Sequence, residues 1–295
     1  MTPLITPLTG TLELDTDALY RLIEHVIAGG VNGIFLPGTN GECASLPIEI
    51  RKELIISAME AIRGRVPLFV NVSTSSYLES LNLIEFSAEI GADYAVLAPP
   101  FYFNMNQKEL LRYIEMLADR SSLPLFLYNA PQYFKTEIET GTVAELARHE
   151  KIMGIKDSSG NMDYFGQLLN GRKKDDFTVL VGPEIFLGEC VTLGCNGGVN
   201  GGSNMFPKLY VNMYQAAVRK DSKEIKKWQA LIGKVEQDVY SITDSPVNTI
   251  IGLKYILAIK GICSEQMAMP VYSPFTEQQK RIMQELVAEF DGYGL

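Results

Sequence analysis

A lysine at the end of an apolar run is the residue of this sequence most clearly placed for chemistry. Residues 151–160 read KIMGIKDSSG, so the run IMGI predicts a buried strand that ends at Lys156. Strand side chains alternate, and if Gly154 and Lys156 face the interior, burial lowers the pKa of the lysine from about 10.4. A neutral amine attacks carbonyl carbon, so we expect a Schiff-base nucleophile, with Gly154 leaving room for a substrate. The alternative is a structural cation paired with Asp157.

A tyrosine ends the preceding predicted strand, in the run FLYNAP. Its phenol, that of Tyr128, can approach Lys156 if the two strands are neighbours. A Schiff-base cycle needs a group that moves protons on and off the reacting atoms, and a tyrosine can do this. The alternative is a core tyrosine whose hydroxyl is hydrogen-bonded.

The turn PGTNGE, residues 37–42, offers Thr39, Asn40 and several backbone N–H groups directly before a predicted helix. Turns of this kind bind anions, and this one would suit a carboxylate. The alternative is a plain strand-to-helix turn in which Gly38 and Gly41 permit unusual backbone dihedrals.

The elements that must position these residues alternate between short apolar runs and amphipathic segments. The predicted strands are Leu4–Pro7, Gly33–Pro37, Leu68–Val72, Tyr94–Ala98, Leu125–Tyr128, Met153–Lys156, Thr178–Val181 and Gly198–Asn200. Eight β-α units predict an α/β fold, a (β/α)₈ TIM barrel, whose catalytic groups lie at the carboxyl ends of the strands. A doubly wound open sheet is the second choice, but the first strand lacks a GxGxxG turn. Residues 1–220 would form the barrel, and 221–295 a three-helix extension packed on it (Lys223–Val239, Val247–Lys260 and Thr276–Phe290).

Composition argues against several classes of function. The chain has 35 acidic and 26 basic residues and a net charge of −9, which disfavours binding to nucleic acid or anionic membranes. It has no apolar run of about 18 residues, and its first ten residues lack the basic and apolar regions of a leader, so we expect neither a membrane-spanning helix nor a signal peptide. The four scattered cysteines suggest free thiols in the cytoplasm. Two histidines supply a metal site or a Ser-His-Asp triad poorly, so no metal is expected.

The runs GTNGE, PPFYF, YNAP and GIKDSSGN, in this order, resemble the dihydrodipicolinate synthase / N-acetylneuraminate lyase family of class I aldolases. The resemblance covers nearly the whole chain. It implies a (β/α)₈ barrel, commonly a homotetramer built as a dimer of dimers, that acts on a 2-oxo acid and an aldehyde without a cofactor.

The resemblance also assigns roles. Lys156 would form the Schiff base with pyruvate, Tyr128 would transfer protons, and Thr39 would link Tyr128 into a relay. Tyr102 would be a second relay tyrosine, possibly lent to a partner subunit. The turn residues Thr39 and Asn40 would hold the 2-oxo acid carboxylate. Two further residues, Gly182 and Val199, would line the cavity behind the lysine.

Two positions depart from the family pattern. Synthases carry an arginine that grips the second substrate's carboxylate where this chain has Tyr133, and a guanidinium's two-pronged contact has no equivalent in other residue types. Asn40 replaces the usual second hydroxyl of the turn. The first hypothesis is therefore an aldolase for 2-keto-3-deoxy sugar acids or sialic acid, with Tyr133 as a substrate-binding residue. The alternatives are 4-hydroxy-tetrahydrodipicolinate synthase, which joins pyruvate to aspartate semialdehyde, a keto-deoxy sugar acid dehydratase, and a non-catalytic binding protein.

Overall fold

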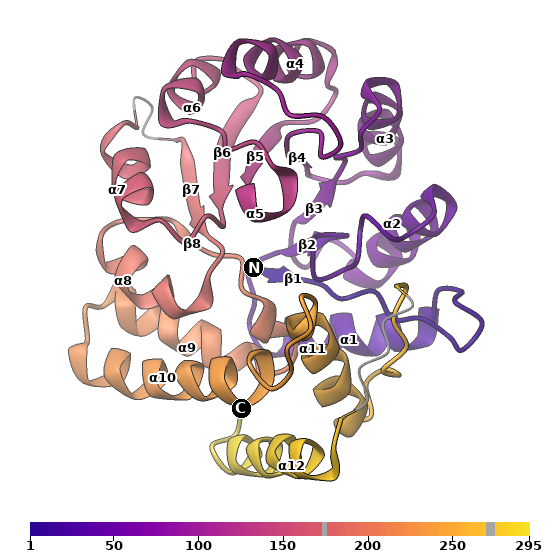
Figure 1. Cartoon of the computed structure of the whole chain (residues 1–295), viewed down its shortest axis with the longest axis vertical. Helices are drawn as coiled ribbons and strands as arrows, with labels where there is room; N and C mark the ends of the chain where they lie inside the picture. The colour runs from indigo at the N-terminus through magenta and orange to yellow at the C-terminus, as the bar shows by residue number, and fades with distance from the viewer. Residues whose placement is uncertain (173–175, 270–274) are drawn as a thin grey trace. The chain divides into compact units, whose positions relative to one another are not determined.

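The computed structural model describes residues 1–172, 176–269 and 275–295 (Figure 1). Its strands are β1 (Thr2–Pro3), β2 (Ile34–Leu36), β3 (Leu68–Asn71), β4 (Tyr94–Leu97), β5 (Leu125–Asn129), β6 (Ile152–Asp157), β7 (Thr178–Val181) and β8 (Gly197–Gly198). Its α-helices are α1 (Thr16–Ala28), α2 (Ile48–Ile62), α3 (Tyr77–Ile90), α4 (Gln107–Arg120), α5 (Pro131–Phe134), α6 (Thr140–Leu146), α7 (Met162–Asn170), α8 (Leu187–Thr192), α9 (Pro207–Val218), α10 (Ser222–Val235), α11 (Asn248–Ile259) and α12 (Glu277–Gly292). Short helical turns are η1 (Glu184–Phe186), η2 (Gly201–Asn204) and the π-helical η3 (Glu236–Tyr240).

The chain divides into two compact units, and each is described by itself. The first unit holds residues 1–66 and 200–295, and the second holds residues 67–199. The predicted boundary at residue 220 falls between α9 and α10, two helices of the first unit that pack against each other. That boundary stays a prediction.

The second unit is a run of parallel strands, β3 to β8, paired in chain order. In Figure 1, helices α3, α4, α6 and α7 flank these strands, and α4 packs against α3 and α6. Every residue of β3 and β5 is buried, as expected for parallel strands covered on both faces. Polar caps start two of these helices: Asn106 and Glu109 form a capping box at α4, and the Asn161 side chain accepts the Asp163 and Tyr164 N–H groups in the first turn of α7.

The first unit pairs β1 with β2 and surrounds them with helices. Helix α1 packs on α2, α9 packs on α10, and α11 contacts α12 and η3. Asn204 of η2 ties the second segment of this unit to β1 and the residues after it, because its side chain accepts the Ile5 N–H at 3.1 Å and donates to the Pro3 carbonyl at 2.9 Å. Residues distant in the chain are therefore joined by a buried amide.

Most predicted strands agree with the structure within one or two residues, but the first was placed wrongly. The prediction was Leu4–Pro7, whereas β1 covers Thr2–Pro3. The Ile5 N–H bonds to the Asn204 side chain instead of a neighbouring strand, so the ladder ends early. The eighth strand is also earlier than the predicted Gly198–Asn200, at Gly197–Gly198. The three predicted C-terminal helices correspond to α10 with η3, α11 and α12.

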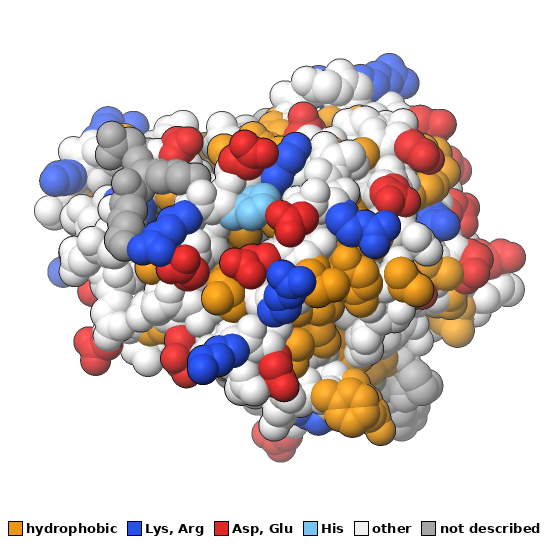
Figure 2. Space-filling view, turned by 90° about the horizontal axis from the view of Figure 1, so that it is seen from above, with side chains coloured by type: hydrophobic (Ala, Val, Ile, Leu, Met, Phe, Trp, Pro, Cys, Tyr) orange, Lys and Arg blue, Asp and Glu red, His pale blue; other side chains and the backbone are white. Residues whose placement is uncertain are grey.

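On the face shown in Figure 2, basic and acidic side chains are interspersed with uncharged surface. Within residues 1–172, 176–269 and 275–295, no helix is both long and apolar enough to span a membrane.

Candidate active site

Lys156 and Tyr128 lie side by side near the carboxyl ends of β6 and β5. They are register partners in the parallel ladder, so their side chains leave the same face of the sheet. The Lys156 Nζ atom lies 4.2 Å from the centroid of the Tyr128 ring. Both residues are buried, with 7% and 2% of their surface exposed. The amine and the phenol paired by the sequence prediction are therefore brought together, and their catalytic roles stay predictions.

A second cross-strand pair, Asn129 and Asp157, follows one residue later. The Asn129 Nδ2 atom donates to Asp157 Oδ1 at 2.8 Å, and Asn129 Oδ1 accepts the Ile138 N–H at 3.0 Å. The Ser159 hydroxyl donates to Asp157 Oδ2 at 2.9 Å, and its N–H donates to Oδ1 at 3.2 Å. Burial raises the pKa of Asp157, while hydrogen bonds from Asn129 and Ser159 oppose that rise.

This buried pair was not among the sequence predictions. Its signal is the polar residue that directly follows Tyr128 in YNAP and Lys156 in GIKDSSG. Alternation along β6 directs Asp157 to the opposite face from Lys156, and its carboxylate is held by Asn129 and Ser159. The pair fixes the ends of both strands and so the backbone that carries the reactive side chains.

The space beside Gly154 is filled, which corrects one expectation. The sequence suggested that this glycine leaves room for a substrate. A Cβ atom there would lie 2.4 Å from the Thr178 carbonyl oxygen and 2.6 Å from the Phe126 ring. Phe126 packs edge-on against Phe69 and Tyr94, with ring centroids 5.2 and 5.3 Å away. The absence of a side chain at Gly154 therefore lets the Phe126 ring pack there, two residues before Tyr128 and Lys156 on their strands.

Tyr102 lies on the loop after β4 and is exposed. Its side chain is 69% exposed and its ring meets that of Phe103 edge-on, with centroids 4.8 Å apart. The predicted relay role, in this subunit or in a partner, stays a prediction.

Tyr133 lies on the short helix α5, close behind β5. Its side chain is 52% exposed, and partial desolvation together with the nearby Tyr128 raises the pKa of its phenol. The next residue, Phe134, packs edge-on against the Tyr128 ring at 5.4 Å. The helix thus holds one face of Tyr128 and presents Tyr133 on the same short segment.

Gly182 and Val199 follow β7 and β8. The Gly182 N–H donates to the Asp157 carbonyl at 2.7 Å, and the Val199 N–H donates to the Val181 carbonyl at 2.9 Å. A Cβ atom at Gly182 would lie 2.0 Å from the Ser158 hydroxyl, so this glycine permits close packing of β7 on β6. Val199 is buried. Their predicted role in lining a substrate cavity stays a prediction.

The turn of residues 37–42 belongs to the first unit and is closed by backbone hydrogen bonds. The Thr39 carbonyl accepts the Glu42 N–H at 2.9 Å, and the Gly38 carbonyl accepts the Gly41 N–H at 3.1 Å. Thr39 and Asn40 are half-buried at its tip. Binding of a carboxylate by these two residues stays a prediction.

Within residues 1–172, 176–269 and 275–295, no group of three or more His, Cys, Asp or Glu side chains could hold a metal ion.

Known proteins similar to this chain share one family. Residues 1–289 match the dihydrodipicolinate synthetase family. The 4-hydroxy-tetrahydrodipicolinate synthase of Methanosarcina mazei is 29% identical over 286 residues, 97% of this chain and 96% of that protein. The synthase of Stenotrophomonas maltophilia is 32% identical over 230 residues, 78% of this chain and 77% of that protein. A Thermococcus onnurineus protein described as an uncharacterized DapA-like lyase is 27% identical and covers 97% of both chains.

Solved structures agree with these relatives. Dihydrodipicolinate synthase from Bacteroides thetaiotaomicron is 40% identical, with a TM-score of 0.92 over 98% of this chain and 97% of that chain. YagE of E. coli K12, a prophage protein of the dihydrodipicolinic acid synthase family solved with pyruvate, is 26% identical, with a TM-score of 0.91 over 98% and 97%. The predicted fold class, a (β/α)₈ barrel with C-terminal helices, is confirmed. The chain belongs to the dihydrodipicolinate synthetase family of class I, pyruvate-dependent lyases.

Proposed function

We propose that this chain forms a Schiff base between Lys156 and pyruvate and makes or breaks a carbon–carbon bond at the pyruvate methyl carbon. The observation that carries the proposal is the buried Lys156 amine, 4.2 Å from the centroid of the Tyr128 ring. The pyruvate complex of YagE supports pyruvate as the 2-oxo acid.

The chemistry follows from these two side chains. The neutral amine attacks the ketone carbon, and the resulting carbinolamine loses water to give an iminium. The iminium accepts the electron pair released when a bond to the neighbouring carbon breaks, so no cofactor is required for that step. The Tyr128 phenol transfers protons to and from the carbinolamine and the acceptor oxygen. Thr39 completes its relay, and Thr39 and Asn40 hold the carboxylate.

The relatives support aspartate semialdehyde as the first aldehyde to test. Named relatives at 29–32% identity are 4-hydroxy-tetrahydrodipicolinate synthases, and the similar structure from Bacteroides thetaiotaomicron is that of a dihydrodipicolinate synthase. This reverses the order of the sequence hypotheses, which placed a sugar-acid aldolase first.

The second candidate, cleavage of a 2-keto-3-deoxy sugar acid or sialic acid, is favoured by Tyr133. A phenol donates one hydrogen bond, whereas the synthase arginine grips a carboxylate with two. The half-exposed Tyr133 fits a hydroxylated substrate better than a second carboxylate. A dehydratase would share the Lys156 iminium and expel water instead.

The test is intact mass after borohydride reduction in the presence of pyruvate. Wild type should gain a pyruvate-sized adduct and Lys156→Ala should not. Lys151→Ala, a change in the half-buried lysine before β6, should behave as wild type. The absence of an adduct on wild type would refute the proposal and favour a binding protein.

Product analysis then identifies the acceptor. Pyruvate consumption with aspartate semialdehyde would support the synthase. Pyruvate release from 2-keto-3-deoxygluconate or N-acetylneuraminate would support the aldolase. Loss of water without pyruvate release would support the dehydratase.

We also propose a homotetramer in the cytoplasm. The exposed Tyr102 and Phe103 rings support burial of this loop by a partner subunit, and four cysteines that form no disulfide suit a reducing compartment. Light scattering that gives a monomer mass would refute the tetramer.

A further inference from the structure

We propose that Glu42 and Lys254 are positioning residues that hold the turn of residues 37–42 in its carboxylate-binding conformation. The proposal rests on the proposed function, because it concerns the turn that would bind pyruvate. Neither residue was among the predicted site residues. Glu42 closes the turn, and Lys254 comes from helix α11 of the same unit.

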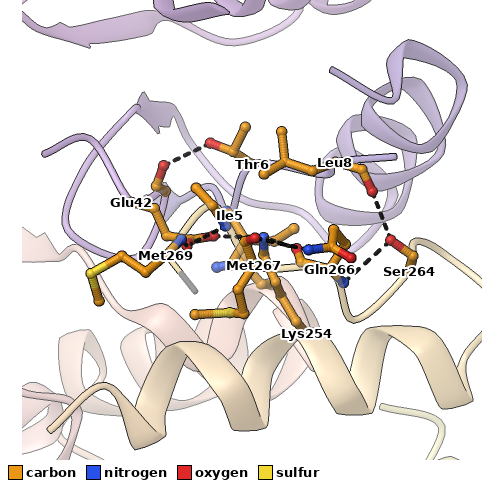
Figure 3. Close-up of polar contacts among 12 residues, drawn as sticks. Ile5, Thr6, Leu8, Glu42, Lys254, Ser264, Gln266, Met267 and Met269 are labelled. Carbon is orange, nitrogen blue, oxygen red and sulfur yellow. Dashed lines mark hydrogen bonds and ion pairs between the residues drawn. The ribbon is translucent and has the colours of Figure 1, made fainter. Parts of the chain in front are cut away.

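The two side chains form a buried ion pair with no exposed charge. The Lys254 Nζ atom lies 2.6 Å from Glu42 Oε1, and the side chains are 0% and 1% exposed. Figure 3 shows Lys254 reaching from its helix to Glu42 and to the segment that carries Gln266 and Met269. Nζ also donates to the Gln266 carbonyl at 2.5 Å, and Glu42 Oε2 accepts the Ala268 and Met269 N–H groups at 2.8 and 3.2 Å.

Stability alone does not explain such a pair. Moving two charges out of water is costly, and well-packed apolar residues often replace a buried ion pair without loss of stability. Burial lowers the pKa of Lys254, and the Glu42 carboxylate opposes that shift. We therefore look for a role of the pair other than stability, and the position of Glu42 in the turn of residues 37–42 indicates one.

The backbone of Glu42 is the point where this anchor meets the turn. Its φ of 57° lies in the left-handed region, which is unfavourable for a residue with a Cβ and persists only where surrounding contacts hold it. Its N–H donates to the Thr39 carbonyl at 2.9 Å. The side-chain anchor thus holds a strained residue, and that residue holds Thr39 by a direct hydrogen bond.

A second contact ties the turn to the same framework. The Thr6 hydroxyl donates to the Gly41 carbonyl at 2.8 Å, and the Ser264 hydroxyl donates to the Leu8 carbonyl at 2.7 Å (Figure 3). Hydrogen bonds therefore connect the turn, the segment after β1 and residues 264–269 to one another. Releasing Glu42 from Lys254 loosens the turn while the other contacts keep the chain folded.

The experiment measures the pyruvate concentration that gives half-maximal borohydride trapping at Lys156. The variants are Glu42→Gln, Lys254→Met and the double variant, which removes both charges and so leaves none unpaired. We expect half-saturation to rise about tenfold or more in each, because loss of one hydrogen bond to a charged carboxylate weakens binding by about that factor. At saturating pyruvate, every folded variant should still be trapped in full.

The matched control is Lys260→Met. Lys260 caps the end of the same helix and pairs with Asp291 of α12 at 3.1 Å, away from the turn. Its loss should leave half-saturation unchanged, even if the melting temperature falls. Unchanged half-saturation in any folded Glu42 or Lys254 variant would overturn the proposal.

A measurement on wild type keeps the proposal falsifiable if the variants do not fold. Pyruvate should slow hydrogen exchange at the Ala268 and Met269 amides, which donate to Glu42, because a ligand that orders the turn stabilises its anchor. Unchanged exchange in fully trapped protein would overturn the positioning role and leave the proposed function intact. Absence of trapping on wild type would instead refute the proposed function itself.

Discussion

Replacing Tyr128 by phenylalanine isolates the proposed proton transfer from everything else the residue does. The substitution removes one oxygen and keeps the ring that lies 4.2 Å from the Lys156 amine and packs on Phe134 at 5.4 Å. The burial of Lys156 is therefore retained. A positioned general acid–base contributes about 10²- to 10⁴-fold to rate, equivalent to about 2.7–5.4 kcal/mol of activation free energy.

The assay needs only pyruvate. An iminium at Lys156 makes the methyl protons of pyruvate acidic, so they exchange with deuterium in D₂O, and proton NMR follows their loss. Tyr128→Phe should slow this exchange by about 10² or more, while the final extent of borohydride trapping reaches the wild-type value. The free energy of unfolding should fall by only about 1 kcal/mol, the worth of one hydrogen bond.

Tyr164→Phe is the matched control. Tyr164 is a buried tyrosine of α7 in the same unit, and its hydroxyl donates to the Ile138 carbonyl. Its loss should lower stability by a similar amount and leave exchange unchanged. Exchange in Tyr128→Phe within about threefold of wild type would refute the assignment, because a general acid–base is worth far more. Tyr128 would then be a packing residue for Lys156.

Three further predictions follow from single positions. Tyr133→Arg should increase pyruvate consumption with aspartate semialdehyde if the missing guanidinium limits that reaction; an unchanged or lower rate would show that other residues hold the aldehyde. Gly154→Ala should lower the free energy of unfolding in urea by about 1–3 kcal/mol, because its Cβ would lie 2.4 Å from the Thr178 oxygen, whereas Gly166→Ala, with open space, should not destabilise. Burial lowers the pKa of His25, so the unfolded chain binds its proton first and stability is lost as pH falls below about 6.5. Urea unfolding at pH 7 and 5 should therefore show a smaller loss in His25→Gln, and an equal loss would contradict this reasoning.

The pairing of Lys156 with Tyr128 was predictable because it follows from local rules. Two apolar runs predict neighbouring parallel strands, and side chains that end those strands on one face must meet. The same rules fail where a residue of the adjacent strand determines whether a space is filled. Gly154 suggests empty space in its own strand, but Phe126 of the adjacent strand fills it. The alternation of side chains along a strand predicts which face a side chain lies on, but it does not predict the size of the neighbouring side chains on that face.

Contacts between segments that are distant in the chain are harder still to predict from the sequence. The strand predicted at Leu4–Pro7 ends early because the side chain of Asn204 takes the Ile5 amide. Glu42 looks like an ordinary acidic residue of a turn, and Lys254 looks like a lysine on an apolar helix. Only the folded chain shows that they bury each other's charge.

The Tyr128–Lys156 pair of the second unit and the turn of residues 37–42 of the first unit are held by different physical means, and this should separate their mutational effects. Tyr128 and Lys156 stand on strands joined by a backbone ladder and locked by the buried Asn129–Asp157 pair. Few single side-chain changes outside that pair can move them, so among the supporting residues of these strands it is Asn129 and Asp157 whose substitution should change the rate of chemistry. The turn that carries Thr39 depends instead on the side chain of Glu42 and a lysine of α11. Changes in the C-terminal helices should therefore act on pyruvate affinity before they act on rate, although those helices supply no reacting group.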